Sequence, residues 1–279
     1  TIFPAGPTAS DSLLANLSAL NDYDGEYQVQ HNNVSYNWYV ANRPITILSL
    51  PFTNNIYSDD NRTTFDYSSN ELAGRLYGFR GLSTGLPVYT KDNCTIGGCY
   101  RFNSSNYINI TDPNNLTLGM NNFSILFWYD PEGTNITADL NNPKYIFSRN
   151  YSSSDVLSVQ IAKNTTQISV YLAITNRTLN TRSSKIDSVT TNNPDKKVFI
   201  AITRNGNTGN VTVIFNGTAS VSKDSDPNAV FGPLISNVSN INAYLGSSAA
   251  DSTNGLGGVN GTIDEFMIFN RTLTPEQVK

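Results

Sequence analysis

The carboxylates are the first residues of this chain to weigh for chemistry, and the most conspicuous pair is Asp264-Glu265 in the stretch GTIDEFMIFNRTLTPEQ. Hydrolysis of a glycosidic bond needs two carboxyl groups about 5 to 10 Å apart on one face. A strand provides that only at alternating positions, so this adjacent pair is expected to point to opposite faces. Alternating pairs do occur, in expected turns: Asp22/Asp24, Asp24/Glu26, Asp130/Glu132 and Asp224/Asp226. We therefore predict that the chain is not an enzyme.

The remaining catalytic and metal-binding residue types are scarce. His31 is the one histidine, which leaves little material for a Ser-His-Asp triad. Cys94 and Cys99 lie close together in DNCTIGGCYRF, but a zinc site needs four ligands. We predict a local disulfide across the Gly-Gly turn, worth roughly 2 kcal/mol in the chain-entropy model. Such a bond pins a loop and is typical of an oxidising extracellular compartment.

Asparagine followed two places later by Ser or Thr is unusually frequent. About 17 such sequons occur where about 8 are expected by chance, and none has Pro in the middle. An Asn- and Thr-rich surface can make sequons without using them, but the excess favours an exported chain that carries N-linked glycans. The predicted glycosylation sites are Asn16, Asn33, Asn61, Asn93, Asn103, Asn109, Asn115, Asn122, Asn135, Asn150, Asn164, Asn176, Asn210, Asn216, Asn237, Asn260 and Asn270.

The middle residues of these sequons are often apolar. In a strand, the Asn and the Ser or Thr share one face, while the residue between them points to the other. The apolar middle residues are Leu17, Val34, Ile110, Leu116, Phe123, Ile136, Tyr151, Val211 and Val238. This pattern predicts an antiparallel sandwich with a glycosylated outer face.

The composition of the chain limits the binding partners that can be expected. Charged residues make up 14% of the chain and the net charge is −4, so nucleic acid is not an expected partner. No apolar run approaches the roughly 18 residues that cross a bilayer, and the chain opens on Thr1. We expect no membrane span here, with any signal or anchor removed or lying elsewhere.

Strand signals recur along the chain. Alternating apolar residues separated by Asn, Gly, Pro and Asp predict strands over residues 34–40, 44–50, 100–110, 122–130, 144–150, 156–162, 168–174, 196–204, 210–217, 241–246 and 261–270. Hairpin turns are expected at Asp24-Gly25, Asn205-Gly206 and Asn216-Gly217. The one helix signal is the cap and proline start at Thr274-Pro275. The fold class is therefore all-β.

The chain divides unevenly. Residues 1–47 contain about half of a small β-sandwich, which could not bury its apolar face alone. Residues 48–279 contain enough strands for a complete two-sheet antiparallel jelly roll. Trp38 and Trp128 lie on apolar strands and are expected in the core, whereas Tyr89, Tyr107 and Tyr129 are left open between core packing and a sugar site. Loops are expected to carry any binding site.

Three stretches of the larger region follow one another in a familiar order: FDYSSN at 65–70, IGGCYRFNSSNYINI at 96–110 and the closing GTIDEFMIFNRTLTPEQ. In these stretches the region resembles the laminin-G-like, concanavalin A-type lectin fold. Residues 1–47 resemble the first half of the immunoglobulin-like repeats of archaeal cell-surface proteins, into which a laminin-G-like domain can be inserted.

The resemblance implies a calcium site. Asp264 on the closing strand and Asp66 near the first strand are neighbours in the family fold, and Ca²⁺ is a reasonable partner for buried carboxylates. Alternatively, Asp264 accepts backbone hydrogen bonds from the adjoining loop. Two residues depart from the family pattern: Asn103 stands where Asp is common and Glu71 where Gly is usual. Either departure is expected to weaken a cation site without affecting the fold.

These expectations define two functional hypotheses. The first is a non-enzymatic extracellular glycoprotein domain of an archaeal-type cell surface, whose partners are glycans or surface proteins in adhesion. The alternative is a structural subunit of an extracellular filament, sheath or virion, in which the jelly roll carries glycans and residues 1–47 mediate self-assembly.

Overall fold

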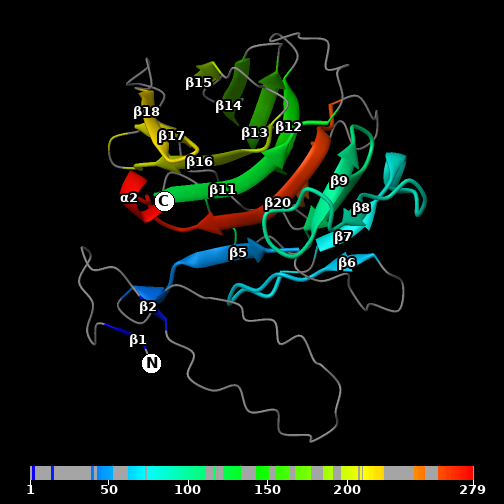
Figure 1. Ribbon diagram of the computed structural model, residues 1–279, viewed down its shortest axis with the longest axis horizontal. Helices are drawn as coiled ribbons and strands as arrows, with labels where there is room; N and C mark the ends of the chain where they lie inside the picture. The colour runs from blue at the N-terminus through cyan, green and yellow to red at the C-terminus, as the bar shows by residue number, and fades with distance from the viewer. Residues whose placement is uncertain are drawn as a thin grey trace, which may run out of the picture. The chain divides into compact units, whose positions relative to one another are not determined.

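The computed structural model describes a sandwich of two antiparallel sheets with almost no helix (Figure 1). The residues described are 2–3, 14–15, 39–40, 43–52, 62–72, 74–110, 116, 118, 122–132, 143–150, 155–163, 167–176, 185–190, 196–206, 208, 210–222, 242–248 and 257–278. The all-β jelly-roll prediction is confirmed. Within this part of the chain, no helix has both the length and the apolar character needed to cross a membrane.

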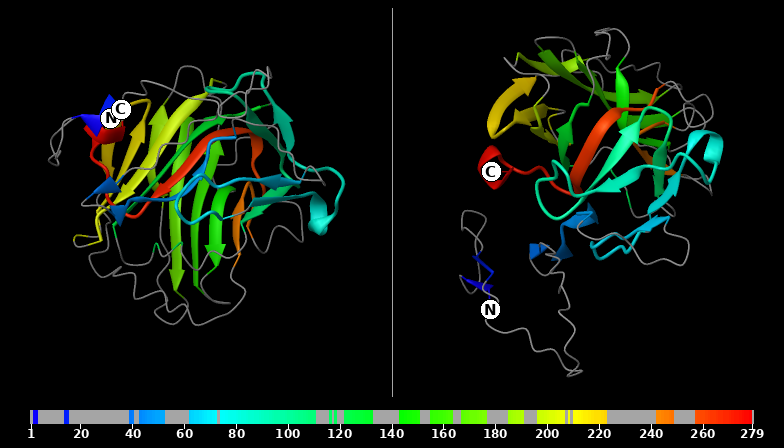
Figure 2. Two further views of the ribbon diagram at one scale, coloured as in Figure 1. Left: turned by 90° about the horizontal axis from the view of Figure 1, so that it is seen from below. Right: turned by 45° about the vertical axis from the view of Figure 1, so that its right-hand side comes forward.

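Sheet A, as we call the first sheet, has the order β15-β14-β13-β12-β19-β10-β7-β6. Its strands are β6 (Thr63–Thr64), β7 (Gly74–Tyr77), β10 (Tyr107–Ile110), β12 (Lys144–Asn150), β13 (Asp155–Lys163), β14 (Gln167–Asn176), β15 (Lys185–Thr190) and β19 (Ala243–Leu245). The long strands β12, β13 and β14 run side by side (Figure 2).

Sheet B, the second sheet, has the order β18-β17-β16-β11-β20-β9-β8, and β5 also pairs with β20. Its strands are β5 (Thr46–Leu50), β8 (Val88–Thr90), β9 (Cys99–Asn103), β11 (Phe123–Asp130), β16 (Val198–Arg204), β17 (Val211–Phe215), β18 (Thr218–Ser222) and β20 (Asn260–Phe269). A 3₁₀ turn, η1 (Phe79–Gly81), precedes β8, and helix α2 (Pro275–Val278) follows β20.

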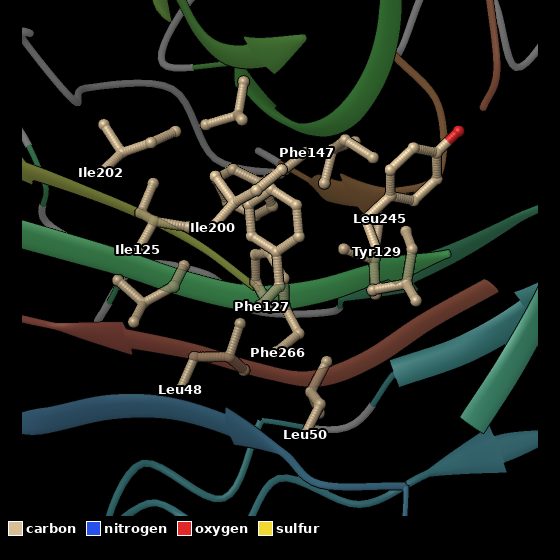
Figure 3. Close-up of a cluster of buried hydrophobic side chains, with 14 of the residues drawn as sticks. Leu48, Leu50, Ile125, Phe127, Tyr129, Phe147, Ile200, Ile202, Leu245 and Phe266 are labelled. Carbon is tan, nitrogen blue, oxygen red and sulfur yellow. The ribbon is translucent and has the colours of Figure 1, made fainter. Parts of the chain in front are cut away.

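The core lies between the sheets because every second residue of their strands is apolar and points inward. Leu48, Leu50, Ile125, Phe127, Ile200 and Phe266 from sheet B meet Phe147 and Leu245 from sheet A (Figure 3). The middle residues of four described sequons are buried in or beside this core, as predicted: Ile110, Leu116, Phe123 and Val211. Removing this apolar area from water is the main force that joins the sheets.

Two of the turn and cap predictions are confirmed, the hairpin at Asn216-Gly217 and the helix start at Thr274-Pro275. Asn216 and Gly217 have φ of 48° and 81°, so the β17–β18 hairpin closes with positive φ at both central residues. Thr274 and Gln277 form a capping box at α2: Gln277 Oε1 accepts the Thr274 N–H at 3.0 Å, and the Gln277 N–H donates to Thr274 Oγ1 at 3.4 Å. The expected turn at Asp24-Gly25 lies outside the described residues.

The expectation of one continuous strand over residues 100–110 is wrong. The chain turns at Ser104, which has φ of 71°, so β9 belongs to sheet B and β10 to sheet A. Asn106 holds the corner: its Oδ1 accepts the Asn103 N–H at 3.1 Å, and its Nδ2 donates to Gly85 O at 3.1 Å. The Asn side chain replaces hydrogen bonds that a continuing strand would have made.

The chain forms two compact units, residues 1–34 and residues 35–279. In the first, β1 (Ile2–Phe3) pairs with β2 (Leu14–Ala15); in the second, a short ribbon of β3 (Tyr39–Val40) and β4 (Arg43–Pro44) precedes the sandwich. Strand β5 crosses the boundary expected between residues 47 and 48. The immunoglobulin-like assignment of residues 1–47 stays a prediction.

Candidate functional site

The outer face of sheet A carries a row of aromatic and hydrogen-bonding side chains. Across neighbouring strands, Asn109 on β10 pairs with Arg75 on β7 and with Tyr244 on β19. Tyr244 in turn pairs with Ser148 on β12. Tyr77 and Tyr107 form the adjacent pair on β7 and β10. We call these six residues the tyrosine face.

The register explains why these side chains share a face. Leu76, Ile108 and Leu245 are the inward residues of β7, β10 and β19, and all are buried in the core. Their immediate neighbours along each strand must point to the other side. The same alternation places Ser158, Gln160 and Tyr171 of β13 and β14 beyond Ser148, which extends the polar character across the sheet.

The tyrosine rings are held in place by one another. Tyr77 stacks on Tyr107 with ring centroids 5.5 Å apart, and Tyr107 meets Tyr244 edge-on at 5.7 Å. The Arg75 guanidinium lies 5.9 Å from the Tyr77 ring centroid, and Asn242 Nδ2 donates to the Tyr244 hydroxyl at 3.3 Å. Each ring pair contributes about 0.5–1.5 kcal/mol beyond burial, so the face is preorganised.

The six residues of this face differ in exposure. Tyr77 and Tyr244 are half-buried and Arg75 is exposed, whereas Tyr107 and Ser148 are buried and the Ser148 hydroxyl donates to Ser247 O at 3.0 Å. Tyrosine rings can pack against the C–H face of a sugar, while amide, guanidinium and hydroxyl groups bind its hydroxyls. None of the tyrosine-face side chains is a carboxylate, so these six residues offer no acid–base pair for hydrolysis.

The structure shows where the three tyrosines lie whose role the sequence did not decide. Tyr107 lies on the tyrosine face, whereas Tyr129 is in the core, where its hydroxyl donates to Asn260 O at 2.7 Å and burial raises its pKa. Tyr89 packs against the core and meets Tyr100 edge-on at 5.8 Å. Tyr77 and Tyr244 were missed, although Tyr77 lies one residue after an inward apolar residue and Tyr244 one residue before one. The candidate face is on strands rather than on the expected loops.

Trp128 is not in the core, contrary to expectation. It follows inward-facing Phe127 on β11 and therefore points to the outer face of sheet B, where it packs on Phe199 with centroids 5.2 Å apart. Because both faces of β11 are covered, its sequence does not alternate between apolar and polar residues, and the inward face could not be identified from it. Trp38 lies outside the described residues.

Asp66 is buried and satisfied by protein donors. Its Oδ1 accepts the backbone N–H groups of Ser49 at 2.7 Å and Ser68 at 2.8 Å. Its Oδ2 accepts the Ser68 hydroxyl at 2.6 Å and the Leu72 N–H at 2.9 Å. Four donors aimed at one carboxylate stabilise its charge without a metal and do not fit a calcium ligand. Glu71 nearby has φ of 50°, which explains why glycine is usual there.

Asp264 anchors the disulfide loop. Its Oδ2 accepts the Thr95 N–H at 2.5 Å, which is the alternative that the sequence left open. The loop is closed by the Cys94–Cys99 disulfide, with Cα atoms 5.5 Å apart. Asp264 Oδ1 is buried and has no hydrogen-bond partner among the described residues, and burial raises the pKa of this carboxyl. A single carboxylate oxygen does not make a cation site, because Ca²⁺ takes about six to eight oxygen ligands.

No group of three or more His, Cys, Asp and Glu side chains suited to a metal occurs in the described part of the chain. Calcium bound jointly by Asp66 and Asp264 therefore stays a prediction, and the donors around Asp66 argue against it. Asn103, the other departure from the family pattern, uses its Oδ1 to accept the Ser105 N–H and hydroxyl at 3.2 and 3.0 Å.

The Asp264-Glu265 step is a β-bulge, so the expectation based on regular alternation does not apply there. Trp128 pairs with Asp264 while Leu126 pairs with Met267, which leaves one extra residue on β20. Glu265 has φ of 51°. Burial, and then the nearby Asp264 charge, raises the pKa of Glu265 to about 7, a range in which a carboxyl can donate a proton.

A proton donor alone does not make a hydrolase. Glu132, from the predicted Asp130/Glu132 pair, is occupied by an ion pair: Arg101 Nε donates to Glu132 Oε1 at 2.8 Å. The Thr262 hydroxyl lies 3.3 Å from the same oxygen. The other predicted pairs, Asp22/Asp24, Asp24/Glu26 and Asp224/Asp226, lie outside the described residues, as does His31.

The sequon asparagines divide by exposure. Among those whose side chains the structure describes, the exposed ones are Asn93, Asn103, Asn122, Asn210, Asn216 and Asn270. Asn260 is half-buried and its Nδ2 donates to Glu132 O at 3.2 Å, so its attachment nitrogen is already engaged. Asn109 is half-buried on the tyrosine face. For Asn16, Asn33, Asn61, Asn115, Asn135, Asn150, Asn164, Asn176 and Asn237, glycosylation stays a prediction without a described side chain.

The chain is thus an antiparallel β-sandwich with a row of aromatic and polar side chains on the outer face of one sheet. A laminin-G-type family model, described as the concanavalin A-like lectin/glucanases superfamily, matches residues 102–279. This is more than half of the chain, which therefore belongs to that superfamily. No curated protein matches the sequence significantly.

Solved structures share the fold at low sequence identity. Domain 4 of AbnA, an extracellular GH43 arabinanase from Geobacillus stearothermophilus, in complex with arabinotriose, has a TM-score of 0.58 and 20% identity over 84% of this chain and 96% of that one. The botulinum neurotoxin type G receptor-binding domain has a TM-score of 0.53 and 19% identity over 84% and 50%. The binding domain of Paraclostridial mosquitocidal protein 1 has a TM-score of 0.54 and 16% identity over 84% and 51%. This chain spans about half of each toxin domain.

Proposed function

We propose that this chain is a non-enzymatic glycan-binding domain of an extracellular glycoprotein, and that the tyrosine face of sheet A is its binding site. The observation that carries the proposal is the register row Arg75, Asn109 and Tyr244, which keep exposed surface, beside the stacked Tyr77–Tyr107 pair. Rigid aromatic rings next to convergent polar groups suit a ligand that has both C–H faces and hydroxyls.

The similar structures support binding rather than hydrolysis. One is a domain of an arabinanase with arabinotriose bound, and others are receptor-binding domains of toxins. The absence of a carboxylate among the six tyrosine-face residues agrees with this reading. The ion pair and hydrogen bonds that occupy Glu132 give that carboxylate a structural role.

Two features support an extracellular location. The Cys94–Cys99 disulfide persists most readily in an oxidising compartment. Six of the described sequon asparagines are exposed, so their side chains are accessible to a bulky glycan.

The proposal is tested by screening the full chain on a glycan array and titrating arabinotriose by calorimetry. Tyr244→Ala is expected to weaken binding at least tenfold, a loss of about 1.4 kcal/mol, because it removes a half-buried ring that lies directly opposite Asn109. Phe199→Ala is the matched control, since Phe199 is a half-buried aromatic residue on the outer face of sheet B.

Two results would contradict the proposal. Unchanged affinity in folded Tyr244→Ala would move the binding site away from the tyrosine face. No glycan bound by the folded chain would favour the structural role, with the jelly roll as a glycan-carrying domain and residues 1–47 as the place to look for self-assembly.

A further inference from the structure

Asn109 is both a residue of the tyrosine face and the acceptor of a sequon, Asn109-Ile110-Thr111. We propose that a glycan attached to Asn109 lies over the tyrosine face and occupies it within the same chain. Modification at one asparagine then decides whether the face is available to outside glycans. The inference deepens the proposed function and rests on it.

The register brings the attachment point next to the rings. Tyr244 is the direct partner of Asn109 across β10 and β19, and Arg75 is its partner across β10 and β7. Directly opposite residues have Cβ atoms about 4.5–5.5 Å apart, which is about the width of one sugar ring. Tyr107 lies two residues away on the same face, at about 7 Å. The first sugar on Asn109 therefore lies next to Tyr244 and Arg75, which keep exposed surface, whereas Tyr107 is buried beneath them.

The side chain of Asn109 is suited to modification. It is half-buried, while its Oδ1 is fully buried and has no hydrogen-bond partner among the described residues. Unlike Oδ1, the Nδ2 atom, to which sugar is attached, is not buried without a partner. This differs from Asn260, the other half-buried sequon asparagine whose side chain is described, because Asn260 Nδ2 donates to Glu132 O.

Position separates Asn109 from the exposed sequon asparagines. Asn103 is the last residue of β9, Asn122 precedes β11, and Asn216 lies in the turn after β17. Glycans there extend from strand ends and turns. Asn109 lies inside a strand that has paired neighbours on both sides, so its glycan has the sheet surface as its immediate floor.

Covalent attachment makes weak contacts sufficient. A short tether gives an intramolecular ligand an effective concentration in the millimolar range. A sugar that binds the tyrosine face with a dissociation constant of about 1 mM would occupy it about half the time or more when carried on Asn109. An outside glycan must then displace it.

The test compares the wild-type chain with Thr111→Ala, both made in a host that N-glycosylates. Thr111→Ala removes the sequon and keeps Asn109. Thr212→Ala, which removes the exposed Asn210 sequon on sheet B, is the matched control. Glycopeptide mass spectrometry measures occupancy, tetranitromethane measures how fast Tyr244 is nitrated, and arabinotriose and the glycan array measure binding.

We expect Asn109 to be occupied in the wild type, Tyr244 to be nitrated at least fivefold faster in Thr111→Ala, and oligosaccharide affinity to be at least fivefold higher in that variant. Thr212→Ala should match the wild type. Chain made without glycosylation should behave as Thr111→Ala does, which keeps the test valid if that variant folds poorly.

The inference is overturned if Asn109 carries no glycan in a chain whose Asn103 and Asn122 do, or if an occupied Asn109 leaves the nitration of Tyr244 unchanged. Nitration needs no added ligand, so it separates the two proposals. Slower nitration in the wild type with no oligosaccharide bound by any form would retain the shielding glycan and reject the proposed function. Equal nitration of Tyr244 in all forms, with oligosaccharide bound by all of them, would retain the proposed function and reject the shielding glycan.

Discussion

The outer faces of the two sheets are built on the same alternation but have opposite chemistry. On sheet B, the outward residues Leu126, Ile214 and Phe269 are apolar, and Leu273 and Val278 of the C-terminal segment cover them. Figures 1 and 2 show α2 at the β16–β18 end of that sheet. On sheet A, the six outward residues of the tyrosine face are tyrosines and polar side chains.

This difference teaches how one sandwich separates stability from recognition. Inward residues of both sheets are apolar and form one core. The residue types at the outward positions then decide whether a face becomes a second, smaller core or a surface that binds a ligand. Covering an apolar face stabilises the fold by roughly 25 cal/mol per Å² buried, whereas on the tyrosine face Arg75, Tyr77, Asn109 and Tyr244 keep surface that is available for the proposed ligand.

The largest expected effect tests this contrast directly. Phe269→Ala removes a ring that is 5% exposed from the satellite core of sheet B, and we expect it to lower the free energy of unfolding by about 3–5 kcal/mol. Tyr244→Ala, on the outer face of sheet A, should lower it by less, about 1–2 kcal/mol, because its ring is only half-buried and makes one edge-on contact with Tyr107. Urea unfolding followed by far-UV circular dichroism measures both. Equal losses would mean that both faces are structural.

The second-largest expected loss of stability concerns Leu273, which covers the apolar outer face of sheet B. Leu273 is 7% exposed, and its N–H donates to Ser124 Oγ at 2.9 Å, while Ser124 Oγ donates to Arg271 O at 2.8 Å. Leu273→Ser keeps these backbone contacts and removes the apolar side chain, so we expect a loss of about 2 kcal/mol. The uncovered face should also bind the dye ANS.

Glycan binding at the tyrosine face should be unchanged in Leu273→Ser, because that residue covers the other sheet. A parallel loss of binding in a folded Leu273→Ser chain would show that the two outer faces are not independent. Glu276→Ala, at a polar position of α2, is a suitable control for the helix itself.

The fold was predictable from sequence because strands and turns are encoded locally. Between residues 122 and 270, alternation identified every described strand except β15 and β18, and Asn216-Gly217 specified its hairpin through positive φ. The division of residues 100–110 between two sheets was not predictable, since both halves alternate and the break depends on the Asn106 side chain reaching Gly85. A tertiary hydrogen bond decided what local periodicity could not.

The candidate site was harder to predict. The Cys94–Cys99 disulfide followed from spacing, and for Asp264 the predicted acceptance of a backbone hydrogen bond from the adjoining loop is observed with the Thr95 N–H, while calcium shared with Asp66 stays a prediction. Alternation defines two faces of a strand without saying which one faces the core when both carry large rings. Trp128 and Tyr244 were therefore distinguishable only after the sheets were assembled. The bulge at Glu265 likewise depends on the pairing of β20 with β11.

The smallest expected effect is a pH dependence confined to sheet B. Burial and the Asp264 charge raise the pKa of Glu265 from 4.5 to about 7. Between those values the folded chain holds a proton that the unfolded chain has lost, so this group's contribution to stability is present below pH 4.5 and is lost as the pH rises through 7. Glu265→Gln should remove that dependence and, at pH 8, stabilise the chain by about 1 kcal/mol, a figure reduced for the partial exposure of the side chain. Unfolding at pH 5 and pH 8 measures it.

The tyrosine face has no carboxylate or imidazole among its six residues, so glycan affinity should stay constant over the same range. A glycan affinity that follows the titration of Glu265 would couple the two faces and break the comparison, whereas a stability change without a change in affinity would confine the titrating group to the structural sheet.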